Sequence, residues 1–218
     1  MISVIVPAYE AKGQYRSLLG DLFDSLVSQT YTDFETIVSD HSESLDLKNF
    51  CESHPLKIRH FFCDQKRGNS SANMNHGISK AEGEWIKVMH MDDFFKRKDS
   101  LEMMADSLKG TTKKWGGFGF DHMRGNEIYN PLVPSMSETF GCPSVSFFAR
   151  EENFFDERLV IINDHDMHNR LYRKYGEPLV IEEICVTIRM HSDQVSQDPS
   201  VMARLDEEWK IFNSHDTN

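Results

Sequence analysis

The fold of this chain is decided by residues 84–93, which read EWIKVMHMDD. The apolar first part of this stretch follows Gly83 and predicts a buried strand that ends in two adjacent carboxylates. Because an unpaired charge is costly to bury, Asp92 and Asp93 must meet solvent, a cation or a partner. Such strand ends form the ligand crevice of an open α/β sheet, where paired carboxylates suit a hard divalent cation and a phosphate ligand. A solvated turn that caps a helix explains the same residues without a ligand.

Strand and helix patterns alternate on both sides of this stretch, which predicts a mixed, mostly parallel sheet with helices on both faces. Apolar or β-branched runs predict strands at residues 2–6, 34–39, 58–62, 85–89, 115–123, 144–149 and 179–190. Helices are expected at residues 18–27, 45–51, 71–81, 100–108, 165–175 and 201–212, with a frayed end after the last one. Few regular signals occur in residues 125–141, so we predict a long functional loop there.

The composition restricts the possible partners. A formal net charge of −11 over 218 residues argues against a nucleic-acid binder and gives no support for a polybasic membrane anchor. No apolar run approaches the roughly 20 residues of a membrane-spanning helix, and the N-terminus has a strand pattern rather than that of a signal peptide. The four cysteines form no C-x-x-C pair, so we expect reduced thiols in a cytoplasmic protein.

Three common motifs are absent from the sequence. There is no G-x-x-x-x-G-K-[ST] phosphate loop and no G-x-S-x-G nucleophile elbow. The first strand is followed by PAYE at residues 7–10 rather than by G-x-G-x-x-G. A P-loop enzyme, an α/β-hydrolase and a dinucleotide-binding Rossmann domain are therefore all disfavoured.

Several segments, taken in order, resemble the inverting family 2 glycosyltransferases, which have the GT-A fold. They are VIVPAY (4–9), SQTYTDFE (28–35), IVSDHS (37–42), NHGI (75–78), AEGEWI (81–86), FDE (155–157), NDHD (163–166) and RMHSDQVS (189–196). The resemblance implies a single GT-A domain over residues 1–218. It would comprise a Rossmann-like nucleotide-binding half (1–95), an acceptor and catalytic half (96–196), and a C-terminal helix and tail (197–218).

The resemblance implies that the nucleotide is held by the opening loop and by the aspartate after the second strand. Tyr9 would stack on the base, and Asp40 would accept a hydrogen bond from a ring N–H. The structural alternatives are a packed tyrosine and a helix-capping aspartate. The other nucleotide contacts that the resemblance implies are Pro7, Glu10 and Asn75.

The metal motif of the family often reads Asp-x-Asp-Asp, whereas here residues 90–93 read HMDD, so His90 replaces the first acid. By resemblance, Asp93 binds the metal and Asp92 contacts the ribose or the sugar. His191 could complete the metal site and Arg189 could contact phosphate, although a lone histidine is often structural. An imidazole ligand would favour Mn over Mg, because Mg strongly prefers oxygen.

A catalytic base is implied at Asp164, where the family has the second residue of a Glu-Asp pair; Asn163 replaces the glutamate. An inverting transfer needs a carboxylate to take the proton of the acceptor hydroxyl. Capping of the following helix is the structural alternative for both residues. Asp166 and Arg170 are four residues apart, which predicts a surface ion pair.

The resulting hypothesis is a metal-dependent, inverting hexosyltransferase that moves a sugar from a nucleotide donor to a hydroxyl. A UDP-sugar is favoured and a GDP-sugar is possible. The acceptor could be a glycan, a lipid-linked saccharide or a protein, as in polysaccharide biosynthesis, with the 125–141 loop on the acceptor side. Two alternatives stay open. A sugar-nucleotide nucleotidyltransferase lacks its usual glycine-rich basic loop here, whereas a noncatalytic nucleotide- or glycan-binding module would explain His90 and Asn163.

Overall fold

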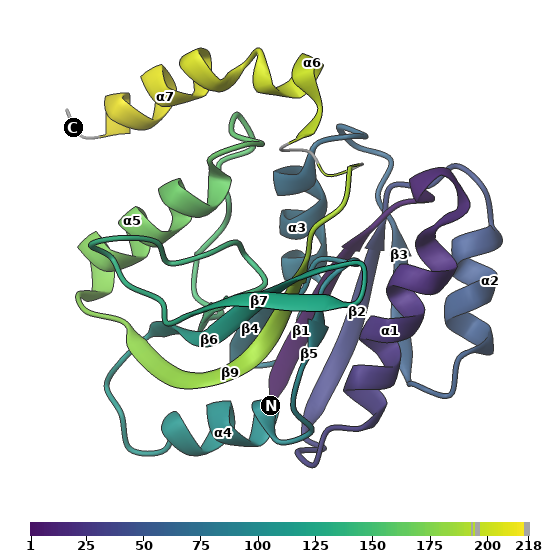
Figure 1. Cartoon of the computed structure of the whole chain (residues 1–218), viewed down its shortest axis with the longest axis horizontal. Helices are drawn as coiled ribbons and strands as arrows, with labels where there is room; N and C mark the ends of the chain where they lie inside the picture. Colours follow the sequence, from purple (N-terminus) through teal and green to yellow (C-terminus); the bar gives the residue numbers. More distant parts are fainter. Residues whose placement is uncertain (193, 195–196, 216–218) are drawn as a thin grey trace.

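A computed structural model describes residues 1–192, 194 and 197–215. One nine-stranded sheet runs through the molecule in the order β3-β2-β1-β4-β8-β6-β9-β5, with β7 beside β6 (Figure 1). The strands are β1 (Ile2–Ala8), β2 (Phe34–Asp40), β3 (Ile58–Phe62), β4 (Trp85–Val88), β5 (Phe94–Phe95), β6 (Trp115–Arg124), β7 (Glu127–Leu132), β8 (Ser146–Ala149) and β9 (Leu179–Arg189). The helices are η1 (Ala11–Gly13), α1 (Tyr15–Val27), α2 (Asp46–Ser53), α3 (Ser70–Ser79), α4 (Ser100–Ser107), α5 (Asn163–Tyr175), α6 (Pro199–Met202) and α7 (Leu205–Ser214).

The strands β3, β2, β1 and β4 are parallel, so their carboxyl ends meet at one edge of the sheet. Ala8 at the end of β1 is in register with Asp40 at the end of β2. The amide of Met89, just after β4, donates to the carbonyl of Ile5 at 2.9 Å. This pairing brings together the loops that follow β1, β2 and β4.

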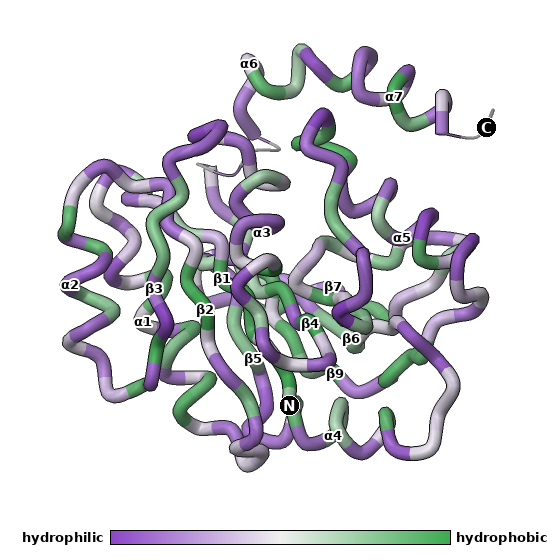
Figure 2. The backbone as a smooth tube through the Cα atoms, turned by 180° about the vertical axis from the view of Figure 1, so that it is seen from behind, coloured by the Kyte–Doolittle hydropathy of each residue, from purple (hydrophilic) through white to green (hydrophobic). Residues whose placement is uncertain are grey.

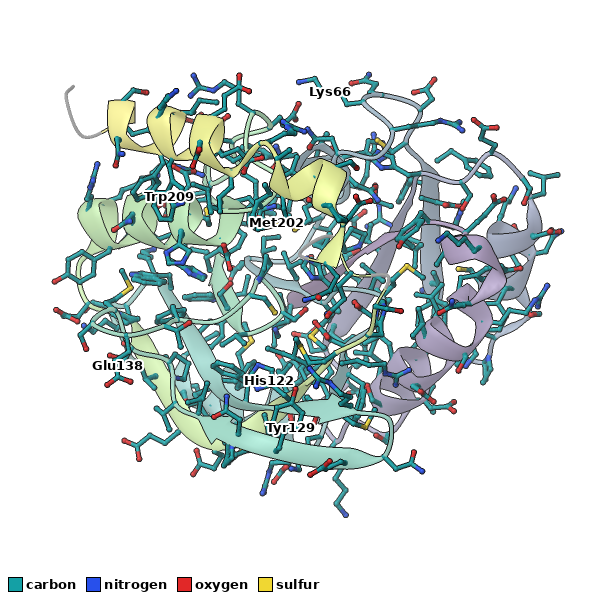
Figure 3. The ribbon with its side chains drawn as sticks, turned by 45° about the horizontal axis from the view of Figure 1, so that its top comes forward. Lys66, His122, Tyr129, Glu138, Met202 and Trp209 are labelled. Atoms are coloured by element: carbon teal, nitrogen blue, oxygen red, sulfur yellow. The ribbon has the colours of Figure 1, made fainter. Side chains whose placement is uncertain are left out.

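The rest of the sheet is mixed. β8 pairs antiparallel with β4 and β6, β9 runs parallel to β6, and β5 runs antiparallel to β9. The prediction of a continuous loop at residues 125–141 is wrong, because β7 pairs antiparallel with β6. The rings of His122 and Tyr129 stack across this hairpin at 5.7 Å, and both are labelled in Figure 3.

Apolar side chains cover both faces of the sheet, as the strand–helix alternation predicts. Helices α1, α2 and α4 contribute to one buried cluster, and α3 and α5 contribute to the other. Figure 2 shows hydrophobic segments in the central strands and mixed colours along the surrounding helices. The helix α3 approaches β1 closely at Gly77, where a Cβ atom would lie 2.5 Å from Ile5 Cγ2.

The chain after β9 folds back over α5 (Figure 1). The single helix expected at residues 201–212 is divided into α6 and α7. Glu208 on α7 is 1% exposed and accepts hydrogen bonds from the amides of three consecutive residues, Val160, Ile161 and Ile162. We call residues 199–215, with these contacts, the C-terminal clasp. The expected frayed end at residues 216–218 lies outside the described residues.

Candidate active site

A cavity of about 630 Å³ lies where the loops after β1 and β2 meet. Tyr9 and Glu10, two of the residues predicted to contact the nucleotide, line this cavity. Tyr9 is 49% exposed, and a Glu10 carboxylate oxygen accepts from the amide of Ser44 at 3.2 Å. Pro7 lies within β1, in register with Ser39, and is not among the residues that line the cavity. The cavity is open, partly polar and large enough for a nucleotide-sized ligand.

Asp40 is fully buried and does not line this cavity. Its carboxylate accepts from the amide of Ser42 at 2.8 Å and lies 2.9 Å from His60 Nε2. The next two residues, His41 and Ser42, line the cavity instead. His41 Nε2 and Ser42 Oγ are buried and have no hydrogen-bond partner among the described residues. Sequence reasoning assigned them no role, although they belong to the IVSDHS segment.

Asn75 on α3 contacts the segment before α5 rather than the cavity. Its amide donates to the carbonyl of Phe155 at 2.9 Å, and its carbonyl accepts from the Phe155 amide at 2.8 Å. Glu157 lies 3.1 Å from the same amide nitrogen. These contacts give Asn75 a structural role, and its nucleotide contact stays a prediction.

The two carboxylates after β4 have different surroundings. Asp92 is half-buried, and its carboxylate lies 3.0 Å from His191 Nε2. Burial alone would raise the pKa of Asp92, but the hydrogen bond from His191 and the charges of His90 and His191 together outweigh burial, so the pKa is lowered. Asp93 is 2% exposed and accepts from the amide of Arg189 at 3.0 Å. Burial and the neighbouring Asp92 charge raise the pKa of Asp93 to about 8.

Three groups that can bind a metal, Asp93 among them, lie close together. One ligand atom each from His90, Asp93 and Cys142 lies within 4.8 Å of the others. His90 Nε2 is buried with no hydrogen-bond partner in the described part of the chain, and the Cys142 thiol lies 3.9 Å from the Asp93 carboxylate. An imidazole, a carboxylate and a thiol together fit a divalent transition-metal ion better than Mg. Cys142 was missed because it lies 49 residues from Asp93 in the sequence.

The two predicted residues after β9 lie beside these groups with partners of their own. His191 contacts Asp92, as described above, and is not among the three converging residues. The guanidinium of Arg189 donates to Asp21 at 2.6 Å and lies over the ring of Phe94. Metal binding by His191 and phosphate binding by Arg189 stay predictions. Asp193, Val195 and Ser196 of the RMHSDQVS segment lie outside the described residues.

A buried lysine links β4 to the segment that begins β8. The Lys87 ammonium donates to the main-chain carbonyls of Val88, Ser144 and Ser146. Burial lowers the pKa of Lys87 to about 7. This lysine therefore ties the parallel and mixed parts of the sheet together close to the carboxylate pair.

Asp164 lies in the first turn of α5 and lines a second, smaller cavity of about 90 Å³. The pKa of the Asp164 carboxyl is raised, because burial is the largest influence on it. The charge of nearby His165 and the hydrogen bond from the His165 main-chain amide act to lower this pKa. The helix cap is Ile162, so the capping alternative for Asn163 and Asp164 is not observed. Asn163 instead donates to Ser71 Oγ at 2.9 Å and fastens α5 to α3.

The predicted surface ion pair on α5 is a buried contact. Asp166 is 1% exposed and accepts from Arg170 Nε at 2.8 Å. Its second oxygen lies 2.8 Å from His215 Nδ1 of the C-terminal clasp. The prediction of a surface pair was wrong because helical spacing alone does not show that another element covers that face.

A curved, mixed sheet with helices on both faces and a carboxylate pair at a strand end defines a GT-A fold. Residues 3–174 match the family described as Glycosyl transferase family 2, and the chain belongs to that family. TarS from S. aureus, solved in complex with UDP, superposes with a TM-score of 0.71 at 16% identity over 88% of this chain. The mannosyltransferase PcManGT from Pyrobaculum calidifontis, solved with GDP-Man and Mn²⁺, superposes with a TM-score of 0.62 at 17% identity over 84%.

Sequence relatives agree with this assignment. An uncharacterized glycosyltransferase of Rickettsia typhi is 22% identical over 90% of this chain. The chain spans 66% of that relative, 61% of the TarS chain and 55% of the PcManGT chain. Among the described residues, no helix has the length and apolar character needed to cross a bilayer.

Proposed function

We propose that this protein is a metal-dependent, inverting glycosyltransferase that moves a hexosyl group from a nucleotide-sugar to a hydroxyl acceptor. The observation that carries the proposal is the Tyr9-lined cavity at the ends of β1 and β2, next to the strand end that holds Asp92 and Asp93. A nucleotide in the cavity would direct its phosphates toward groups suited to a cation. The UDP bound to TarS and the GDP-Man and Mn²⁺ bound to PcManGT support this type of donor.

In this proposal Asp164 is the general base. Its pKa is raised by burial, which strengthens the carboxylate as a proton acceptor. The acceptor oxygen attacks the anomeric carbon and loses its proton to Asp164. The bond from that carbon to the diphosphate oxygen breaks on the opposite face, which inverts the configuration.

The cation would be held by Asp93 with His90 and Cys142, and His191 beyond Asp92 remains a candidate ligand. When bound, it would neutralise charge on the departing diphosphate. The imidazole disfavours Mg, which prefers oxygen ligands, and the thiol suits a softer ion such as Zn. We propose Mn over Mg from the imidazole and from the Mn²⁺ bound to PcManGT, and the screen includes Zn²⁺ for this reason. Tyr9 would stack on the nucleotide base, and Glu10, His41 and Ser42 would surround that base. We propose UDP as the favoured nucleotide and GDP as the second candidate.

The test is a donor screen with UDP-, GDP- and dTDP-sugars in Mn²⁺, Mg²⁺, Zn²⁺ or excess chelator. We expect slow donor hydrolysis or transfer with Mn²⁺, and its loss in chelator and in Asp93→Asn. The exposed Asp206→Asn on α7 is the matched control. Full turnover in chelator contradicts metal dependence, binding without turnover identifies a noncatalytic module, and pyrophosphate-dependent chemistry identifies a nucleotidyltransferase.

A second experiment, calorimetry with UDP and GDP, decides between uracil and guanine as the nucleotide base. Tighter binding of GDP than of UDP contradicts the UDP assignment.

A further inference from the structure

The second cavity lies between the segment 135–141 and the first two turns of α5. Asp164 and His168 both line it and are four residues apart on α5. Side chains with this spacing lie on the same face of a helix, one turn apart. The remaining polar lining comes from Ser135, Glu138, Thr139, His165 and Asn169. The cavity therefore places several hydrogen-bonding groups beside the carboxylate assigned as the base.

His168 is the buried polar group of this cavity. It is 4% exposed, and its ring lies nearly parallel to Trp115, with 6.0 Å between the ring centroids. Phe140 packs against it at 4.7 Å. His168 Nε2 is buried and has no hydrogen-bond partner within the described ranges. Such an atom is costly to leave unpaired, so a ligand that pairs it gains more than an ordinary surface contact provides.

The charge of the cavity restricts which ligand can make this contact. Burial and the nearby His165 lower the pKa of His168 to about 3, so its imidazole is neutral at physiological pH. Glu138 and Asp164 contribute carboxylates, and no lysine or arginine occurs among the described lining residues. A phosphate or carboxylate bound here would lie beside these two acidic side chains, with no basic side chain of the described lining to compensate its negative charge. A neutral imidazole suits a hydroxyl, because it can either donate or accept a hydrogen bond.

We propose that this cavity binds the uncharged, hydroxyl-bearing end of the acceptor, a neutral sugar or polyol, through His168, and that it disfavours acceptors with a charge at that end. The inference rests on the proposed function, since it makes Asp164 the base for the hydroxyl bound there. The aromatic wall of Phe140 gives a sugar ring an apolar surface to pack against. His168 is then a specificity-determining residue of the acceptor site.

The experiment compares the binding of methyl β-D-glucopyranoside with that of glucose 6-phosphate and glucuronic acid, by ligand-observed NMR, to the full chain. We expect the neutral glycoside to bind at least about tenfold more tightly than either anion, because an uncompensated charge costs more than the hydrogen bond gains. His168→Phe keeps an aromatic ring and removes the nitrogens. It should weaken glycoside binding by about tenfold, the cost of one unmade hydrogen bond. His168→Gln places an amide near the position of Nε2 and should restore part of the affinity.

Thermal melting and UDP affinity report whether each variant is folded. Equal or tighter binding of the anions overturns the proposal, and so does undiminished glycoside binding by a folded His168→Phe. If His168→Phe does not fold, the His168→Gln variant and the comparison of ligands on the unmodified protein still test the proposal. The NMR measurement is independent of catalysis. A protein that binds the glycoside through His168 but turns over no donor would retain this inference while contradicting the proposed function.

Discussion

The two regions proposed as the donor side, around Tyr9 and the carboxylate pair, and as the acceptor side, around Asp164, are built differently. On the proposed donor side, the register of neighbouring parallel strands brings the loops with Tyr9, His41 and the Asp92–Asp93 pair to one edge of the sheet. On the acceptor side, Asp164 stands on a helix whose start is fixed by side chains from far along the chain. Asn163 reaches α3, and Glu208 reaches back from α7. The comparison teaches that main-chain pairing largely places the proposed donor groups, whereas individual side-chain contacts place the proposed base.

The largest expected effect is on the acceptor side. Asp164→Asn keeps the shape of the side chain but removes the basic oxygen, so transfer should fall by about a hundredfold or more. UDP affinity, measured by calorimetry, should stay nearly unchanged. Asp166→Asn, which sequence spacing alone suggests as a mild control, is unsuitable because Asp166 is buried against Arg170 and His215. The exposed Asp206→Asn is the control, and loss of UDP binding in Asp164→Asn would contradict the separation of the two sides.

Glu208→Ala tests whether the C-terminal clasp supports only the acceptor side. The change leaves the amides of Val160, Ile161 and Ile162 without their acceptor, which should cost about 2–3 kcal/mol of unfolding free energy. Denaturant titration measures this loss, with the exposed neighbour Glu207→Ala as control. Transfer should fall while UDP affinity holds. An equal loss of UDP affinity in the folded variant would show that the clasp acts on both sides.

Tyr9→Ala examines the donor side with a smaller expected effect. Stacking of a base on an aromatic ring contributes about 1–3 kcal/mol, so donor affinity should fall by roughly tenfold. The transfer rate at saturating donor should change little, because the ring does not touch the reacting atoms in the proposed arrangement. Calorimetry with UDP and steady-state kinetics measure the two quantities. Tyr9→Phe should bind UDP almost normally. Unchanged UDP affinity in Tyr9→Ala would show that Tyr9 does not stack on the nucleotide base.

The last prediction concerns stability rather than activity, at Lys87, which joins the parallel and mixed parts of the sheet. In the unfolded chain Lys87 keeps its proton up to its ordinary pKa of 10.5, but in the folded protein only up to about 7. Between these pH values the unfolded state binds more protons, so this group makes the unfolding free energy rise with pH. Lys87→Met should remove that rise. Denaturant titrations of both proteins at pH 7 and pH 10 measure it, and parallel pH dependences would contradict the lowered pKa.

Sequence reasoning succeeded where local pattern determines structure. The third strand was predicted with its exact bounds at Ile58–Phe62, and the carboxylate pair was placed correctly after β4. The hairpin strand β7 was missed because Glu127–Leu132 is mostly exposed and contains a proline, so it lacks a buried apolar alternation. Cys142, His168 and Glu208 were missed for another reason. Their importance comes from neighbours distant in sequence, and no local pattern specifies those contacts.

The C-terminal clasp also has a consequence for the order in which the molecule is assembled. Chains fold progressively as they are synthesised, beginning from the N-terminal end. The parallel strands β1 to β4 are complete once Val88 has been made, whereas the amides before Asp164 receive their acceptor only when Glu208 follows. His215 reaches Asp166 later still. A nascent chain would therefore form the strands around the Tyr9-lined cavity early and fix the start of α5 late, so an interrupted translation product would have the proposed nucleotide cavity without a fixed proposed base.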